Sequence, residues 1–297
     1  MRLLWCAGEL KSGGLYDTGV MDTKLNTLPL EPLIRFGFFF GILVLMAVWE
    51  LLAPRRDLQT SKSMRWFSNL GIVFIDTLAL RLLLPLLAMD VAILAEKGGW
   101  GLLNNVSLPY SLKVTIAVIV LDLAIYLQHA GFHGLPILWR LHMMHHSDLD
   151  FDVTTGVRFH PIEILLSMGI KMTVVFLVGI SALGVLIFEV LLNATSLFNH
   201  GNVRLAASID RVLRFFVVTP EMHRVHHSVV IRETNSNFGF NLPWWDRLFG
   251  TYKDQPLAGH VRMTIGLSQF RDPKRLTLAW LLLLPFIGEA GKYPMGR

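Results

Sequence analysis

The chain contains one cysteine, Cys6, in 297 residues. This excludes a disulfide framework, a cysteine-ligated structural zinc site and a cysteine-bound iron–sulfur cluster. Charged residues are also scarce, at 16%, while 53% of the residues are hydrophobic and the mean hydropathy is +0.50. That composition is typical of a membrane protein. No HExxH, Rossmann glycine fingerprint or haem-attachment motif is present.

The apolar segments predict an all-α polytopic membrane protein with about four to five membrane-embedded helices. We expect spans within 36–52, 70–94 and 112–128, and a hydrophobic hairpin within 162–197 that is broken between Gly179 and Gly184. The apolar stretch 276–287 is too short to span and should pack on the bundle or lie in the interface. Asp76 and Arg81 fall in the second span, where pairing is the usual solution for buried charge.

Charge predicts the orientation of these spans. The net charge is +5, and the basic residues lie in short loops between apolar runs, which favours membrane topology over nucleic acid as their explanation. The loop with Arg55 and Arg56 should be cytoplasmic and the loop 96–110 should lie outside. We expect no cleaved signal peptide. Trp244, Trp245 and Phe249 are expected to anchor at the interface, as aromatic residues commonly do.

The chain is predicted to have four parts. Residues 1–30 form a poorly structured lead-in, and 31–110 carry the first two transmembrane helices and the outer loop. Residues 111–255 form a catalytic domain that contains the histidine motifs, one transmembrane helix and the hydrophobic hairpin, with the histidine-rich helices as a cytoplasmic cap. Residues 256–297 form a C-terminal segment with a short apolar helix.

Histidines are concentrated in one region. Ten of the eleven lie between His129 and His227, and only His260 lies outside. His133 follows His129 by four positions, which places both on one helical face. A further spacing, H-x-x-H-H, occurs twice. Its members are His142, His145 and His146 in the first copy and His223, His226 and His227 in the second.

Imidazole is the commonest metal ligand in proteins, and these histidines are too many for one ion. They suit two ions with about four or five nitrogens each. His200 is expected to be a further ligand, and His160 is either a ligand or a histidine that caps local structure. Asp122, Asn199 and Asn202 are candidates to orient ligands or a water, because metal-bound histidines usually donate their other N–H to an oxygen.

The ordered motifs resemble the sterol desaturase / fatty acid hydroxylase superfamily over roughly residues 110–255. They are H-x-x-x-H from His129, W-R-x-H-x-x-H-H from Trp139, R-x-H-P from Arg158, N-H-x-N from Asn199, T-P-x-x-H-R-x-H-H from Thr219, and N-F-G-F followed by W-D-R-L-F-G-T-Y. Many relatives have an aromatic residue before the first histidine and arginine after it, where this chain has Gln128 and Ala130. Neither change removes a ligand.

The resemblance implies a membrane-bound non-haem enzyme with two iron ions held by these histidines. It would use O₂ as co-substrate to hydroxylate or desaturate a lipid C–H bond, with electrons from a separate donor protein of the cytochrome b5, ferredoxin or reductase type. The residues alone leave two alternatives open. One is a zinc-dependent membrane hydrolase with Glu163 or Glu221 as general base, and the other is a non-enzymatic metal-binding membrane protein.

Overall fold

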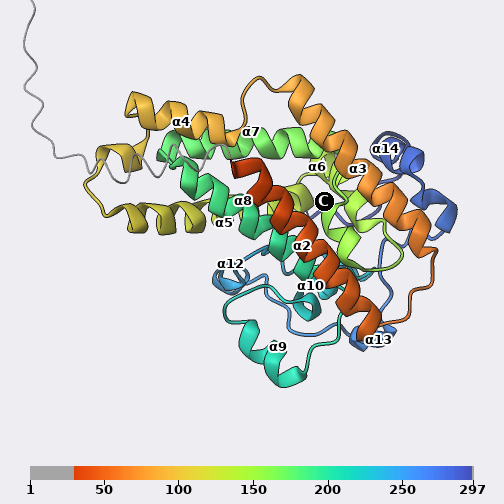
Figure 1. Cartoon of the computed structure of the whole chain (residues 1–297). Helices are drawn as coiled ribbons and strands as arrows, with labels where there is room; N and C mark the ends of the chain where they lie inside the picture. Colours follow the sequence, from red (N-terminus) through yellow and green to blue (C-terminus); the bar gives the residue numbers. More distant parts are fainter. Residues whose placement is uncertain (1–29, 296–297) are drawn as a thin grey trace, which may run out of the picture.

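The computed structural model describes residues 30–295, and the described chain is a bundle of helices without β-strands (Figure 1). Nearly all of the predicted lead-in at 1–30 therefore lies outside the described residues. The helices are α2 Glu31–Leu52, α3 Lys62–Leu83, α4 Ala88–Gly98, η2 Leu102–Asn105, α5 Tyr110–Gly134, α6 Pro136–His146, η3 Val153–Val157, α7 Pro161–Val178, α8 Ala182–Asn199, α9 Ala207–Leu213, α10 Pro220–His226, α11 Ile231–Thr234, α12 Trp244–Leu248, α13 Gly259–Arg262, η4 Pro273–Leu276 and α14 Leu278–Ile287.

Five segments among the described residues are long and apolar enough to cross a membrane: α2, the stretch Lys62–Asn105, α5, α7 and α8. Their apolar side chains mostly point outward, since only 11% of the most apolar window of α2 is buried. Helices that expose apolar residues all round are stable in lipid and unfavourable in water. The predicted all-α class and the predicted four to five membrane-embedded helices are confirmed.

The predicted single span at 70–94 is wrong in detail. Helix α3 begins at Lys62 and ends at Leu83, and α4 begins only at Ala88. Pro85 explains the break, because proline offers no N–H to a helix and disfavours helical torsions in the residue before it. Leu84 is accordingly extended, with φ −113° and ψ 118°. The apolar stretch is thus two helices joined by a bend.

Asp76 and Arg81 were expected to pair inside the bundle, but neither side chain forms an ion pair among residues 30–295. Asp76 is buried on α3, whereas Arg81 is exposed near the end of the same helix. Within residues 30–295 no ion pair joins the two side chains. The buried charges inside the bundle pair elsewhere: Lys171 of α7 and Arg35 of α2 both contact Glu189 of α8, and this cluster ties three helices together.

Helices α7 and α8 form the predicted hydrophobic hairpin. Gly179 ends α7 in the left-handed conformation with φ 72°, which glycine adopts without steric cost. The Ser181 hydroxyl then accepts from the Gly184 N–H and caps α8. Helix α8 packs against both α2 and α5. The turn lies at one end of the molecule, and the other ends of both helices meet near α6 and α10 (Figure 1).

The short apolar helix α14 packs on α3 and α6. Leu281 and Leu284 enter a core with Trp139, Met143 and Tyr293. This core joins the C-terminal segment to the first H-x-x-H-H helix. At ten residues α14 is too short to span, as its sequence predicts.

Candidate metal centre

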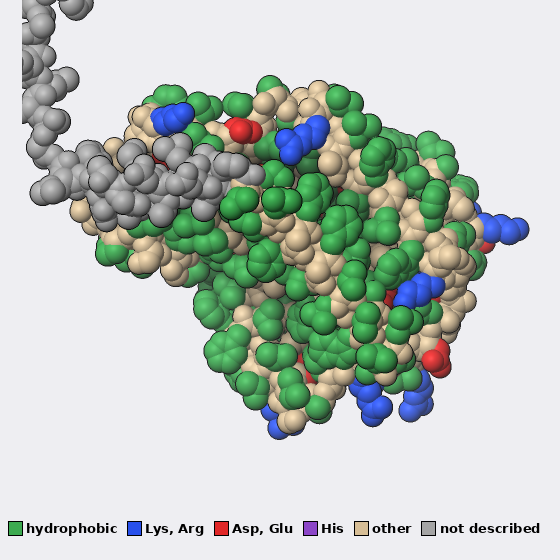
Figure 2. Space-filling model, in the orientation of Figure 1, with side chains coloured by type: hydrophobic (Ala, Val, Ile, Leu, Met, Phe, Trp, Pro, Cys, Tyr) green, Lys and Arg blue, Asp and Glu red, His purple; other side chains and the backbone are tan. Residues whose placement is uncertain are grey.

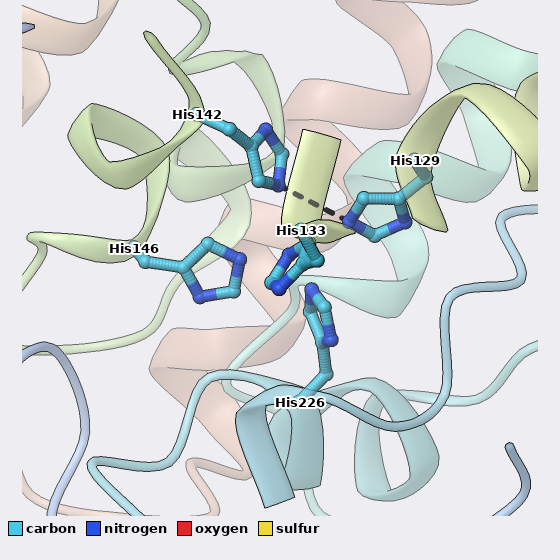
Figure 3. A group of neighbouring side chains, drawn as sticks. All are labelled: His129, His133, His142, His146 and His226. Atoms are coloured by element: carbon cyan, nitrogen blue, oxygen red, sulfur yellow. Dashed lines mark hydrogen bonds between the residues drawn. The ribbon is translucent and has the colours of Figure 1, made fainter. Parts of the chain in front are cut away.

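The structure brings together nine of the ten predicted ligands as two adjacent groups of imidazoles, and every one of the nine is buried. Each residue offers a nitrogen within 4.8 Å of the others in its group. The first group, whose rings converge in Figure 3, comes from α5, α6 and α10. Its members are His129, His133, His142, His146 and His226. The second group consists of His145, His200, His223 and His227.

The H-x-x-H-H spacing distributes the histidines of each motif between the two groups. In α6, His142 and His146 are one helical turn apart and point into the first group, while His145 turns into the second. At the end of α10 the assignment is reversed. There His223 and His227 point into the second group, and His226 into the first. Each motif therefore contributes to both groups.

Six of the nine rings are oriented by a hydrogen bond from Nδ1 to an acceptor outside the groups. Backbone carbonyls accept in four cases, so Nδ1 must carry the proton there. The pairs are His129 with Phe238 O at 2.7 Å, His145 with Arg158 O at 3.1 Å, His200 with Ser196 O at 2.8 Å, His226 with Ser236 O at 2.7 Å, His133 with Asn235 Oδ1 at 3.0 Å and His142 with Glu163 Oε1 at 2.7 Å. Such contacts fix ring orientation and leave Nε2 with a free lone pair.

The inward nitrogens fit a bound cation. Nε2 of His129 lies 3.1 Å from Nε2 of His142, and in the second group Nε2 of His145 lies 3.2 Å from Nε2 of His200. All four rings donate through Nδ1, so these contacts oppose two lone pairs. Metal–nitrogen bonds of about 2.1 Å bring two ligands of one ion to about 3 Å from each other. A cation bound between the two nitrogens of each pair would replace the repulsion between their lone pairs with two metal–nitrogen bonds.

Several buried nitrogens also lack any hydrogen-bond partner in the described chain: Nε2 of His133, His146 and His226, and both ring nitrogens of His227. Unsatisfied buried polar atoms are costly and rare, which makes a group of them an indication of a missing ligand. The donor set contains only nitrogen. Nitrogen donors of this kind suit iron, zinc, copper or nickel.

Burial keeps the histidines of the cap in the form that binds metal. Desolvation lowers the pKa of His142 and of His200 to about 3. Desolvation, together with repulsion from neighbouring imidazoles, also lowers the pKa of five other histidines well below the usual value of 6.5. They are His145, His146, His223, His226 and His227. These rings are therefore neutral at pH 7.

His160 lies outside both groups. Its Nδ1 accepts from the Ile162 N–H at the start of α7, and its Nε2 donates to the Leu282 carbonyl of α14 at 3.2 Å. It joins two helices and caps one of them. The geometry corresponds to the capping alternative that the sequence leaves open for this residue.

Asp122, Asn199 and Asn202 make no hydrogen bond to the grouped histidines among the described residues. Asp122 accepts from the Trp245 indole at 2.8 Å and from two backbone N–H groups after Phe240. Asn199 donates to the Phe240 carbonyl, and Asn202 pairs with backbone groups of Arg56. Asp122 and Asn199 hold the loop whose Phe238 carbonyl orients His129, so their influence on the site is indirect.

Sequence reasoning missed the residues that do orient the ligands directly. Glu163 drew attention only as a general base, yet its carboxylate accepts from His142 Nδ1. Its position two residues after the R-x-H-P motif was the available signal. The carbonyls of Ser236 and Phe238 carried no signal, because a backbone acceptor can be supplied by any residue. Asn235 acts through its side-chain Oδ1, but it lies outside the histidine motifs.

The C-terminal segment closes the first group although it is distant in sequence. The Tyr293 carbonyl accepts from Asn235 Nδ2 at 2.7 Å, which points Asn235 Oδ1 at His133. The Met295 N–H donates to the His133 carbonyl at 2.9 Å. The Tyr293 ring stacks on Trp139 with centroids 5.6 Å apart, and Trp139 contacts His133. Residues 293–295 thus fix both the backbone and the ring of one candidate ligand.

Asn235→Leu should loosen metal binding at the first group, because His133 loses the acceptor that sets its tautomer. Changes to such partners typically cost about 10- to 100-fold in metal affinity. Asn235→Asp is the matched variant, since it keeps an acceptor for His133 and loses only the donor to Tyr293. Metal retained against a graded chelator measures the difference. Equal retention by wild type and Asn235→Leu would contradict this role.

The loop that follows α6, from His146 to Arg158, is held by buried ion pairs. The Arg65 guanidinium of α3 binds both oxygens of Asp148 at 2.7 and 2.8 Å and also binds Asp152 at 2.6 Å. All three side chains are fully buried. Burial alone would raise the pKa of Asp148, but the positive charge of Arg65 outweighs burial and helps to hold that pKa at about 2. The loop leads directly from His146 to Arg158, whose carbonyl orients His145.

Residues 114–251 match the sequence model of the fatty acid hydroxylase family. The ornithine lipid hydroxylase OlsE of Rhizobium tropici is 31% identical over 148 residues, which is 50% of this chain and 44% of that protein. Alkylglycerol monooxygenase of Xenopus tropicalis is 27% identical over 54% of this chain and 36% of its own length, and the human protein of that name is 25% identical over 51% and 32%. The matches span less than half of each relative's length. No solved structure matches the chain.

Proposed function

Residues 114–251 belong to the fatty acid hydroxylase family, and from that premise we propose that the chain is a membrane-bound oxygenase that hydroxylates or desaturates a lipid at a C–H bond. The observation that carries the proposal is the pair of buried groups with five and four imidazoles. Two groups next to each other suit two iron ions. Bound there, the ions would supply the oxidation chemistry and O₂ the oxidant.

The chain's own residues would do the rest of the work. Six Nδ1 hydrogen bonds hold the rings with Nε2 inward, and complete burial keeps bulk water from the centre. His129 and His133 stand near one end of the span α5, which supports a site beside lipid, where a substrate could keep its apolar chain in the bilayer. We place the site on the cytoplasmic face because the loop with Arg55 and Arg56 is basic, and we assign the supply of electrons to a separate donor protein.

The relatives' names indicate the substrate class. One is named for hydroxylating an ornithine lipid and the other for oxygenating alkylglycerols. An ornithine lipid and an alkylglycerol both combine an apolar part with a polar head. We propose that this protein takes a substrate of the same class and oxidises one carbon of its hydrocarbon chain.

The zinc hydrolase requires a carboxylate as general base, and each of the two candidates already has a partner, although Oε2 of Glu163 accepts no hydrogen bond among the described residues. Glu163 accepts from His142. Glu221 contacts Arg55 at 2.6 Å, Arg224 at 3.2 Å and His260 at 3.0 Å. Burial raises the pKa of Glu221, but these partners outweigh it and hold the pKa at about 2, which makes the group a weak base.

Membranes that contain the chain, supplied with a reductant and an electron donor, should convert part of their lipid to products that carry one added oxygen atom or one added double bond. Isotopically labelled O₂ should appear in any alcohol, because the oxygen would come from the gas and not from water. Mass spectrometry of extracted lipids measures both. Membranes with His200→Ala serve as control. Turnover that continues without O₂, or label that enters only from water, would contradict an oxygenase.

A further inference from the structure

An exposed apolar surface lies on the cap beside the spans. Seven large hydrophobic side chains from two short segments are each between 45% and 69% exposed. We call them the ledge: Ile209, Val212, Phe215, Phe216, Trp244, Leu248 and Phe249. Figure 2 shows hydrophobic side chains over the lower part of the molecule, where Figure 1 places α9 and α12.

The ledge is rigidly built. The Trp244 indole donates to the Phe215 carbonyl at 2.7 Å, and the Arg247 guanidinium donates to the Arg214 carbonyl at 2.9 Å, so α9 and α12 are joined. Beneath them Arg214 is buried and contacts Asp210 at 2.7 Å. Because these contacts hold α9 and α12 in place, the aromatic side chains of the ledge stay exposed. Clusters of exposed apolar residues on a folded protein mark an interaction site.

The ledge continues the lipid-facing surface of the spans. A mostly apolar groove of about 320 Å³ lies between the spans and the segment that carries Phe215 and Phe216 of the ledge. Helix α2 lines it with Ile42, Leu45, Met46 and Trp49, α8 lines it with Ala194, Thr195 and Phe198, and Leu213 and Val217 line it from the α9 side. A lipid chain lying along α2 and α8 would therefore meet the ledge without crossing a polar boundary.

Arginines accompany the ledge. Arg204, Arg211 and Arg247 are exposed, and the Arg247 guanidinium lies 5.2 Å from the centre of the Phe215 ring and 4.3 Å from that of Tyr252. Aromatic residues with flanking cationic side chains are typical of segments at the level of lipid headgroups. Acyl chains would meet the ledge, and phosphates would meet the guanidinium groups.

We propose that the ledge is seated in the headgroup region of the bilayer leaflet next to the cap, with phospholipid acyl chains against its seven side chains and in the groove, and lipid phosphates at Arg211 and Arg247. This seating fixes how the cap tilts over the membrane. It rests on the membrane-spanning helices and not on the proposed reaction, so it can fail while the oxygenase activity holds.

The test uses the full chain in vesicles of phosphatidylcholine and phosphatidylglycerol. In a Cys6→Ser background, a spin label is attached at Phe216→Cys or, as matched control, at Val261→Cys. Val261 is 59% exposed on α13, which Figure 1 places well away from α12. The label at 216 should collide several times more often with O₂, which concentrates in lipid, than with a water-soluble nickel complex. The control should show the opposite order.

Two outcomes would overturn the proposal. The label at 216 could meet the nickel complex as often as the label at 261 does, which would place the ledge in water. Alternatively, two labels at 216 could show dipolar coupling that disappears on dilution with unlabelled chains, which would mean that a second copy of the chain covers the ledge.

Discussion

Alanine at His145 or at His226 is expected to abolish lipid oxidation, with a loss of more than about a hundredfold. Each variant removes a nitrogen from one group only. Losing an outer hydrogen-bond partner already costs about 10- to 100-fold in metal affinity, and losing a ligand should cost more. Activity is measured on the extracted lipids, and metal per chain is measured on the same preparation.

The two variants should differ in metal content. His145→Ala leaves three imidazoles in its group, whereas His226→Ala leaves four. We therefore expect His145→Ala to retain about one ion per chain and His226→Ala to retain more, if more weakly held. His160→Ala is the matched control, because that ring lies outside both groups and should leave the metal content unchanged. Full activity in His145→Ala would remove that ligand from the assignment.

Arg65→Met should destabilise the fold more than any surface change, by about 3–5 kcal/mol. The substitution keeps much of the side-chain volume but leaves the buried carboxylates of Asp148 and Asp152 without their main cation. Chemical unfolding in a mild detergent, followed by fluorescence, measures the change. Arg81→Met is the matched control on the same helix. Its side chain is exposed, so its expected effect is within about 0.5 kcal/mol.

A second variant separates lost packing from unpaired charge. Adding Asp148→Asn and Asp152→Asn to Arg65→Met removes the carboxylates that the guanidinium neutralised. If unpaired buried charge is the cause, the triple variant should recover part of the lost stability. No recovery would mean that the guanidinium's hydrogen bonds to the loop, including the one to Thr155, are what hold the fold.

Much of the fold could be predicted from the sequence. The composition and the apolar segments predict membrane helices, and the break between Gly179 and Gly184 predicts the hairpin. The error in the second span has a local cause. Pro85 divides a continuous apolar stretch because it interrupts helical hydrogen bonding, which hydropathy does not register.

The spacing of the histidines predicts metal sites, and the number of histidines predicts two of them. That these nine rings bind metal remains a prediction. Which rings share a group could not be read from the sequence. In H-x-x-H-H the first and last histidines lie on one face and the middle histidine points elsewhere, but only the packing of α6 against α10 decides which ion each face would meet.

The sequence by itself determined the fold class, the approximate number of membrane helices and the histidines that are candidates to bind metal, because hydropathy and helical periodicity are local properties of the chain. The tertiary structure alone decided the division into five and four nitrogens. It also decided the capping role of His160 and the orientation of His142 by Glu163 and of His133 by Asn235 and the C-terminal segment. The physical reason is that these side chains meet partners far away in the sequence: Glu163 is 21 residues from His142, Asn235 is 102 residues from His133, and Leu282, which accepts from His160, is 122 residues from it. Their positions depend on how whole helices pack.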